Sequence, residues 1–196
     1  MRKAEEFLTA VFTAEGDVDD EARKIVLLLE SGVDTVHIRK PGLDEAATAG
    51  LIESVPVALR HRLRLHDHFA LAARYGLAGV HLNSRNPEPP AGAASVTASC
   101  HTPAEVRGAS GYEYVTLSPV FDSISKRGYR RAFDIDALGP LLARTRVVAL
   151  GGVTPDSLEL LRQKGFFGAA LLGYIWSGDF GKTSARLAGA IAAMRR

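Results

Sequence analysis

The chain has 196 residues, of which 46% are apolar and 23% are charged, which is the composition of an ordinary globular domain. Its 24 lysines and arginines are interspersed with 22 acidic residues, so the net charge is only +2 and no nucleic-acid partner is expected. The single cysteine, Cys100, excludes an intramolecular disulfide bond and a multi-cysteine zinc site. No apolar run approaches the roughly 20 residues of a membrane span. These short runs predict no membrane partner, and the charged first residues predict no signal peptide. The lone cysteine suits a reducing compartment, so a cytoplasmic location is expected.

Short apolar segments recur along the chain, and helix-like stretches lie between them. Several segments are continuous apolar runs, which is typical of parallel strands that are covered on both faces. The pattern predicts eight strands, at Leu8–Phe12, Thr35–Ile38, Arg62–His66, Gly79–Leu82, Ser95–Ala98, Tyr114–Leu117, Val147–Leu150 and Gly168–Leu172. The predicted helices are Asp19–Glu30, Asp44–Glu53, His68–Tyr75, Pro103–Ala109, Ile135–Ala143, Pro155–Lys164 and Thr183–Met194.

The repeated order of strand and then helix predicts an α/β fold, a compact (β/α)8 TIM barrel with residues 1–196 in a single domain. An open doubly wound sheet is the alternative, but it usually has fewer strands, and its Gly-x-Gly-x-x-Gly turn is absent from the sequence. Barrels of this kind typically have about 250 residues, so the connections must be short. Residues 83–94 include three prolines and leave no room for a full helix, so only a turn is expected there.

Polar residues gather at the C-terminal ends of the predicted strands, which form the active face of a barrel. Five of the six histidines lie at or next to such ends, although each one alone is equally well explained as a structural residue. Histidine titrates near neutral pH and therefore suits proton transfer. The residues of interest at these ends are His37, Arg39, Lys40, His66, Asp67, His68, His81, Asn83, Ser99, His101 and Ser118.

Glycines follow the seventh and eighth predicted strands, as Gly151-Gly152 and as Gly173 before Tyr174. Barrels often bind phosphate with these two loops, because glycine lets backbone amides approach an anion. Crowding at the barrel end is the alternative explanation. The loop Phe121–Arg131 carries four cationic side chains and is expected to act as a lid over an anionic substrate, or else to be a solvated basic loop.

Together these motifs resemble the thiamin phosphate synthase superfamily, which includes the related thiazole tautomerases of TenI type. The resemblance runs from the first to the eighth predicted strand. It rests on Val36–Arg39, Leu65–Asp67, Gly79–Leu82, Ser99–Thr102 with Glu105, Tyr114–Lys126 and Ala149–Val153. It implies substrate contacts for Arg39, Lys40, Ser99, Ser118, Ser123, Ser125 and Lys126, and a thiazole phosphate bound by Gly151, Gly152, Gly173 and Tyr174.

The chain departs from the family pattern at several of these positions. His37 stands where the synthases have a glutamine that contacts the pyrimidine, Lys40 is shifted by one residue, and Gly173 replaces a serine. Two carboxylates usually hold Mg²⁺ in this family. Asp67 matches the first, but Asn86 stands at the second position and is a weaker ligand for the ion. Mg²⁺ is therefore expected only if the chain is a synthase, and no organic cofactor is expected.

The resemblance implies an enzyme that acts on a thiazole phosphate, and the residues favour proton transfer of the tautomerase type. That reaction needs one general acid or base, for which His101 is suited, with His37 or His66 as the second proton carrier. The alternative is a thiamin phosphate synthase with altered pyrimidine and Mg²⁺ contacts, which couples a pyrimidine diphosphate with the thiazole phosphate. The missing carboxylate counts against that alternative, but the available cations Arg39, Lys40 and Lys126 leave it nearly as well supported.

Two other classes of function stay open. His66-x-His68 has the spacing of metal ligands, which His37, His81 and Asp67 could complete in a metal-dependent hydrolase. A non-catalytic regulator that binds a thiazole phosphate would also account for the missing carboxylate. A homo-oligomer is expected only by analogy with the family.

Overall fold

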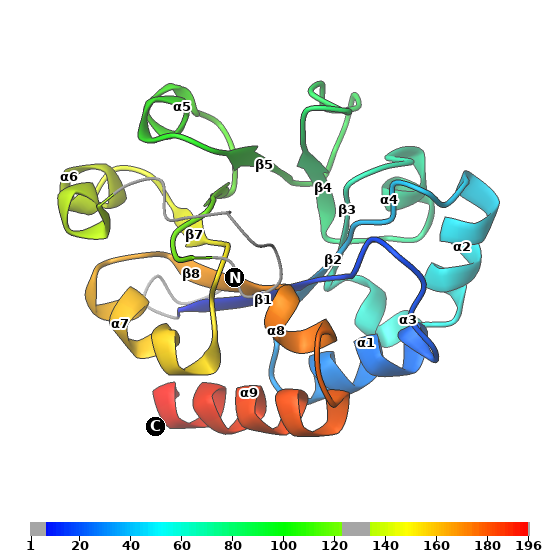
Figure 1. The fold of residues 1–196 in the computed structure, drawn as a ribbon. Helices are drawn as coiled ribbons and strands as arrows, with labels where there is room; N and C mark the ends of the chain where they lie inside the picture. The colour runs from blue at the N-terminus through cyan, green and yellow to red at the C-terminus, as the bar shows by residue number, and fades with distance from the viewer. Residues whose placement is uncertain (1–6, 123–133, 196) are drawn as a thin grey trace.

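The chain forms a closed barrel of eight parallel strands that pair in sequence order, with β8 next to β1 (Figure 1). The structure is a computed structural model that describes residues 7–122 and 134–195. The strands are β1 (Leu8–Phe12), β2 (Thr35–Ile38), β3 (Leu63–Leu65), β4 (Gly79–Leu82), β5 (Val96–Cys100), β6 (Val115–Leu117), β7 (Val147–Ala149) and β8 (Gly168–Leu171). The predicted barrel is therefore confirmed, and each strand ends within two residues of its predicted bounds.

Helices alternate with these strands as the sequence predicts. They are α1 (Glu21–Glu30), α2 (Glu45–Glu53), α3 (Val57–Arg60), α4 (Ala70–Arg74), α5 (Pro103–Gly108), α6 (Gly139–Leu142), α7 (Leu158–Gln163), α8 (Gly173–Trp176) and α9 (Phe180–Met194), with 3₁₀ turns η1 (Ile135–Leu138) and η2 (Pro155–Ser157). The sequence does not predict α3 or α8, because four residues are too few to show helical periodicity. No helix separates β4 from β5, as expected from the prolines between them.

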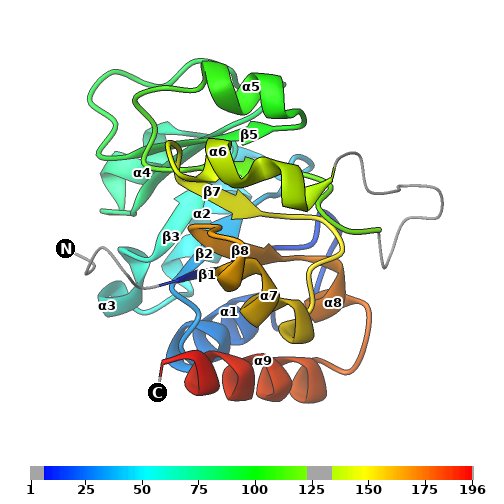
Figure 2. The ribbon, with the colours of Figure 1, turned by 90° about the vertical axis from the view of Figure 1, so that its left-hand side faces the viewer.

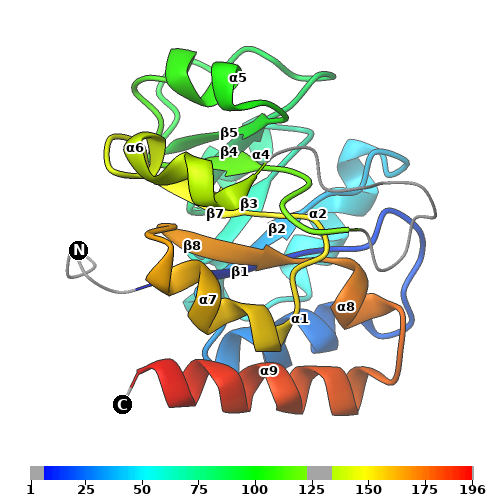
Figure 3. The same ribbon diagram turned by 60° about the vertical axis from the view of Figure 1, so that its left-hand side comes forward.

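The helices surround the barrel in separate groups. Helices α1, α7 and α9 lie together along one side, and α5 lies on the opposite side (Figures 2 and 3). Helix α8 lies at the end of the barrel toward which β8 runs (Figure 3). Among the described helices, none has both the length and the apolar character that crossing a membrane requires.

Along each strand, side chains point alternately outward to the helices and inward to the barrel interior. Outward side chains such as Val36, Val80 and Leu117 join the large core between the barrel and the helices. The interior is apolar near β7, β8 and β1, where Phe12 and Ala170 belong to a second buried cluster. On β2, β3 and β4 the interior residues are instead polar: His37, Arg64 and His81 are all buried. The barrel interior therefore has one apolar and one polar half.

Barrel closure depends on a close approach between β8 and β1. Gly168 is paired with Leu8, and a Cβ on Gly168 would lie 2.3 Å from the Leu8 carbonyl oxygen. Any larger residue at this position must push the two strands apart. Closure of the barrel therefore requires glycine where the first and last strands meet.

We expect Gly168→Ala to lower the free energy of unfolding by about 1–3 kcal/mol, the usual range for overpacking a tight site. Urea denaturation would measure the loss. Gly189→Ala is the matched control, because Gly189 is an exposed residue of α9 with open space around it. The control should gain up to about 1 kcal/mol, since alanine favours helix. Equal stability of the two variants would contradict the steric account of closure.

Candidate active site

A cavity of about 270 Å³ opens at the C-terminal ends of the strands. Every strand contributes to it, either directly or through the loop that follows. Its lining consists of Phe12, Glu15, Arg39, His66, Asn83, Ser84, Arg85, Ser99, His101, Ser118, Leu150, Gly151, Gly152, Val153, Ala170, Leu172, Gly173 and Tyr174. A space of this size suits a small molecule.

Most of the site residues expected from the sequence meet in this cavity. These are Arg39, His66, Ser99, His101, Ser118, Gly151, Gly152, Gly173 and Tyr174. The expected substrate contacts Ser123, Ser125 and Lys126 lie outside the described residues, so their contacts stay predictions.

The sequence interpretation overlooked Arg85, although it is the residue before Asn86. Its importance comes from a spatial contact with Asp67, which spacing along the chain does not show.

The strand-end pattern suggests that Lys40 and His37 line the cavity, but both side chains are buried and neither lines it. The Lys40 side chain is buried, with Nζ 2.7 Å from Glu21 Oε2 and 2.5 Å from the Gly16 carbonyl oxygen. This ion pair fixes the loop before α1, and its position does not suit the expected substrate contact. His37 is fully buried below the cavity, so it can act on a ligand only through other residues.

Two consecutive glycines form the wall next to β7. Gly151 and Gly152 have φ angles of +89° and +69°. A Cβ on Gly151 would lie 2.8 Å from Pro119 Cα, and one on Gly152 would lie 2.3 Å from the Asp122 carbonyl oxygen. Packing against residues 119–122 thus requires glycine at both positions, as the crowding explanation proposed. Their phosphate contact stays a prediction.

Helix α8 places Gly173 and Tyr174 at the opposite side of the phosphate position that the sequence predicts. The amides of Ile175 and Trp176 donate to the Leu172 carbonyl oxygen over 3.1 and 3.4 Å, so a phosphate contact from this helix would fall to Gly173 and Tyr174, and it stays a prediction. Trp176 anchors the helix, because its Nε1 donates to the carbonyl oxygen of Phe12 over 2.7 Å.

His101 stands exposed at the rim of the cavity, just before α5. Its backbone N–H donates to Glu105 Oε2 over 2.6 Å, and Glu105 N–H donates to Thr102 Oγ1 over 3.1 Å, so the start of the helix fixes its backbone. The His101 Nδ1 atom lies 3.3 Å from Ser118 Oγ. The ring is therefore positioned next to a hydroxyl group and can reach a ligand in the cavity.

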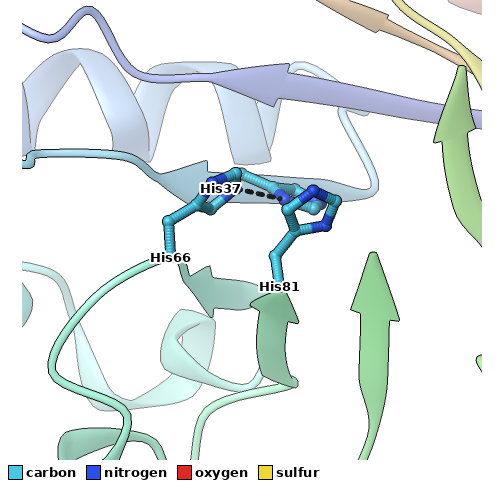
Figure 4. Close-up of side chains that lie close together, drawn as sticks. All are labelled: His37, His66 and His81. Carbon is cyan, nitrogen blue, oxygen red and sulfur yellow. Dashed lines mark hydrogen bonds between the residues drawn. The ribbon is translucent and has the colours of Figure 1, made fainter. Parts of the chain in front are cut away.

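His37, His66 and His81, on or directly after the adjacent strands β2, β3 and β4, form a buried cluster (Figure 4). His66 lines the cavity, so the cluster lies at its floor. His37 Nδ1 lies 3.0 Å from His66 Nε2, and His37 Nε2 lies 2.6 Å from the Tyr114 hydroxyl oxygen. His81 stacks on His66 with ring centroids 4.3 Å apart. Its nitrogens contact the Thr97 and Ser99 hydroxyl groups at 2.8 and 2.9 Å. Hydrogen bonds therefore hold His37 with His66 and His81 with β5, and stacking of His81 on His66 joins the two sets into one floor.

All three rings of the histidine cluster are neutral at neutral pH. Burial lowers the pKa of His37, His66 and His81 well below the usual value, and neighbouring cationic groups lower it further. The pKa of His81 falls to about 3, through burial and then Arg64 and Arg39. Only one hydrogen then lies in the 3.0 Å contact between His37 Nδ1 and His66 Nε2. If His37 donates it, the hydrogen of His66 is on Nδ1, and if His66 donates it, that hydrogen is on Nε2.

The proposed metal-ligand pair His66-x-His68 does not form. His68 Nε2 lies 2.8 Å from the Leu43 carbonyl oxygen, away from the histidine cluster. One nitrogen from each of His37, His66 and His81 does lie within 4.8 Å of the others, a spacing that could hold a metal. However, both nitrogens of His37 and of His81 already have hydrogen-bond partners. The charged residues acting on the cluster are arginines, which oppose a cation.

The expected Mg²⁺ position is filled by the protein's own donors. Arg85 Nη2 lies 3.1 Å from both oxygens of Asp67, and Arg85 Nε lies 3.2 Å from Oδ1. The Asn86 amide nitrogen donates to the same Oδ1 over 2.9 Å and to the His66 carbonyl oxygen over 3.0 Å. Both partners of that amide are acceptors, so its own oxygen does not face Asp67. A guanidinium and an amide N–H group do not fit a Mg²⁺ site, which requires oxygen ligands.

The fold and this cavity define a (β/α)8 barrel with a small-molecule site at the strand ends. The family model described as thiamine monophosphate synthase matches residues 8–175, so the chain belongs to that family. The thiamine-phosphate synthase of Erythrobacter litoralis is 29% identical over 169 residues, which cover 77% of this chain and 79% of the relative. That of Limosilactobacillus fermentum is 26% identical over 179 residues, covering 83% and 84%.

Solved structures agree with the family assignment. A thiamine phosphate pyrophosphorylase from Bacteroides thetaiotaomicron has a TM-score of 0.83 at 28% identity and covers 96% of this chain and 98% of its own. The same-named protein from Pyrococcus furiosus has a TM-score of 0.79 at 18% identity, over 97% and 98% of the two chains, and shows the fold alone.

We expect the free energy of unfolding to fall as the pH is lowered from about 6.5 toward 5. The folded pKa values of the cluster lie below the usual 6.5, so the unfolded chain binds more protons in this range. Each such ring costs on the order of 1.4 kcal/mol of stability per pH unit. The stability is present above pH 6.5 and is lost toward pH 3 for His81.

His81→Gln should reduce the slope of melting temperature against pH in this window, because it removes one of the three rings. His61→Gln is the control, since His61 is exposed and lies outside the cluster. A slope that is the same in His81→Gln as in the wild type would show that this ring does not titrate on unfolding.

Proposed function

We propose that the chain couples a thiazole phosphate with a pyrimidine diphosphate to give thiamin phosphate, with release of diphosphate. The residues alone favour a thiazole tautomerase, but the family model and the two sequence relatives described above are named as synthases, which supports the alternative. The observation that carries the proposal is that two arginines, Arg39 and Arg85, line one cavity whose floor is uncharged. Such a cavity suits a strongly anionic leaving group.

The reaction needs charge stabilisation more than proton transfer. The bond between the pyrimidine methylene carbon and the diphosphate oxygen breaks, and its electron pair leaves with the diphosphate. The thiazole nitrogen then gives its lone pair to the methylene carbon, and a carbon–nitrogen bond forms. Because no proton is lost or gained, the enzyme's task is to hold the departing anion and exclude water.

Arg39 is positioned for the departing anion. Its guanidinium lies at the cavity wall and pairs with Glu15, which also lines the cavity. Its backbone N–H donates to Thr13 Oγ1 over 2.8 Å, which fixes the residue where β2 ends. A cation preorganised in this way stabilises negative charge as it develops, without having to reorient at the moment of reaction.

The neutral histidine cluster suits the pyrimidine, which becomes electron-poor during the same reaction. As the leaving group departs, positive charge develops on the pyrimidine methylene. Protonated rings on the cavity floor would repel that charge, whereas His66 stays neutral because burial lowers its pKa. His66 can also offer a pyrimidine either a donor or an acceptor, according to the direction of its hydrogen bond with His37.

A thiazole tautomerase is the second candidate, because His101 and Ser118 stand together at the rim with His101 Nδ1 3.3 Å from the hydroxyl oxygen. A histidine that is accessible to ligand can move a proton on a thiazole carboxylate phosphate. The two candidates therefore depend on different residues, which allows them to be separated by experiment.

We expect the wild-type chain to form thiamin phosphate from the two phosphorylated substrates, detected as the fluorescent thiochrome derivative. Arg39→Ala should lower kcat/KM by roughly 10²–10³-fold, the usual loss when one preorganised charge-stabilising group is removed. Arg107→Ala is the control, because Arg107 is exposed on α5 and does not line the cavity.

The tautomerase candidate is tested on the same protein with the thiazole carboxylate phosphate tautomer. Under the proposed function, aromatisation should be no faster in wild type than in His101→Ala. Absence of coupling, combined with aromatisation that is lost in His101→Ala, would contradict the proposal and favour the tautomerase.

A further inference from the structure

The contact between Arg85 and Asp67 is built into the loop that follows β4. Asn83 Oδ1 accepts the backbone N–H groups of Arg85 and Asn86 over 3.0 and 3.3 Å. The backbones of Asn83 and Asn86 also exchange two hydrogen bonds of 3.1 Å. This tight turn is tied to β3, because Asn83 Nδ2 donates to the His66 carbonyl oxygen over 2.8 Å. The loop therefore directs Arg85 back over Asp67.

The guanidinium of Arg85 meets Asp67 in a fork. Nη2 reaches both carboxylate oxygens at 3.1 Å, and Nε adds a third contact of 3.2 Å. Asp67 is largely buried, with its side chain 15% exposed, whereas 39% of the Arg85 side chain is exposed. Within residues 7–122 and 134–195, Nη1 of Arg85 makes no hydrogen bond, so its two hydrogens remain for a ligand.

We propose that Arg85 takes the place of the divalent metal ion in this chain, so that the cavity binds a diphosphate-type anion without Mg²⁺. Asp67 holds the guanidinium in position, and Asn86 contributes an amide donor where a second carboxylate would be needed for a metal. Arg85 and Arg39 then present two fixed cations to one anion. The choice of diphosphate rests on the proposed function, but the exclusion of metal from Asp67 does not.

The exclusion of metal is tested by Mn²⁺ binding to the full chain, followed by the EPR signal of the free ion. Wild type should bind no stoichiometric Mn²⁺ at submillimolar concentrations. Arg85→Ala/Asn86→Asp removes the guanidinium and adds a carboxylate, so it should bind one Mn²⁺ per chain, roughly tenfold or more tightly than wild type. Arg186→Ala is the control, because it frees Asp156 from a similar forked arginine outside the cavity.

The anion site is tested by calorimetric titration of inorganic pyrophosphate in the presence of EDTA. Wild type should bind it, Arg85→Ala should bind roughly 10–100-fold more weakly, and Arg85→Lys should fall between them, because lysine keeps the charge but loses the fork. Circular dichroism checks that each variant is folded. If the double variant does not fold, the wild-type Mn²⁺ titration and the Arg85→Lys titration still decide the outcome.

Two results would overturn the inference. One is stoichiometric Mn²⁺ binding by wild type that is lost in Asp67→Asn, and the other is pyrophosphate binding that requires Mg²⁺ or is unchanged in Arg85→Ala. Failure of the coupling assay together with metal-free, Arg85-dependent pyrophosphate binding would count only against the proposed function. Coupling that is abolished by EDTA would count only against this inference.

Discussion

The pairing of β8 with β1 is the constraint on which the cavity depends. Four residue pairs, from Leu8–Gly168 to Val11–Leu171, close the barrel, and Gly168 is the residue that lets the two backbones meet. Closure in parallel order brings all eight strand ends to one rim. Residues as distant in sequence as Phe12 and Gly173 can then line one cavity. The bond from Trp176 to the Phe12 carbonyl oxygen fixes α8 to the same junction.

The polar half of the barrel interior sets the electrostatics of that cavity from below. Arg64 is buried under the histidine cluster, paired with Glu113 at 2.7 Å, and its guanidinium lies 5.4 Å from the centre of the Tyr114 ring. A buried cation here opposes protonation of the rings above it, which is one cause of their lowered pKa values. The floor therefore stays neutral because of burial and of charge placed deeper in the barrel, while the cationic side chains that a ligand can reach stand at the rim.

The sequence predicted the order and position of the strands because each strand is a short buried run between clear helix and glycine signals. It could not predict depth within the barrel. His37 and His81 look like strand-end residues, but residues on both faces of these strands are buried, so the sequence does not show which point inward or how far below the rim they lie. Arg85 looks like an ordinary loop arginine beside a proline-rich turn. Only the fold brings it to Asp67, and only the direction of the Asn86 amide shows that its oxygen faces away from the expected metal position.

The two rim arginines share one feature, which is that each is paired with a carboxylate. Arg39 pairs with Glu15 and Arg85 pairs with Asp67, so each cation is balanced by a carboxylate before any ligand enters. A guanidinium carries one permanent charge and cannot dissociate, whereas Mg²⁺ would bring two charges but only when bound. Two preorganised arginines can supply the same total charge, provided that both contact the anion. In the proposed reaction neither arginine replaces the other, because losing one leaves the departing diphosphate with half of the cationic charge that the described part of the cavity wall provides.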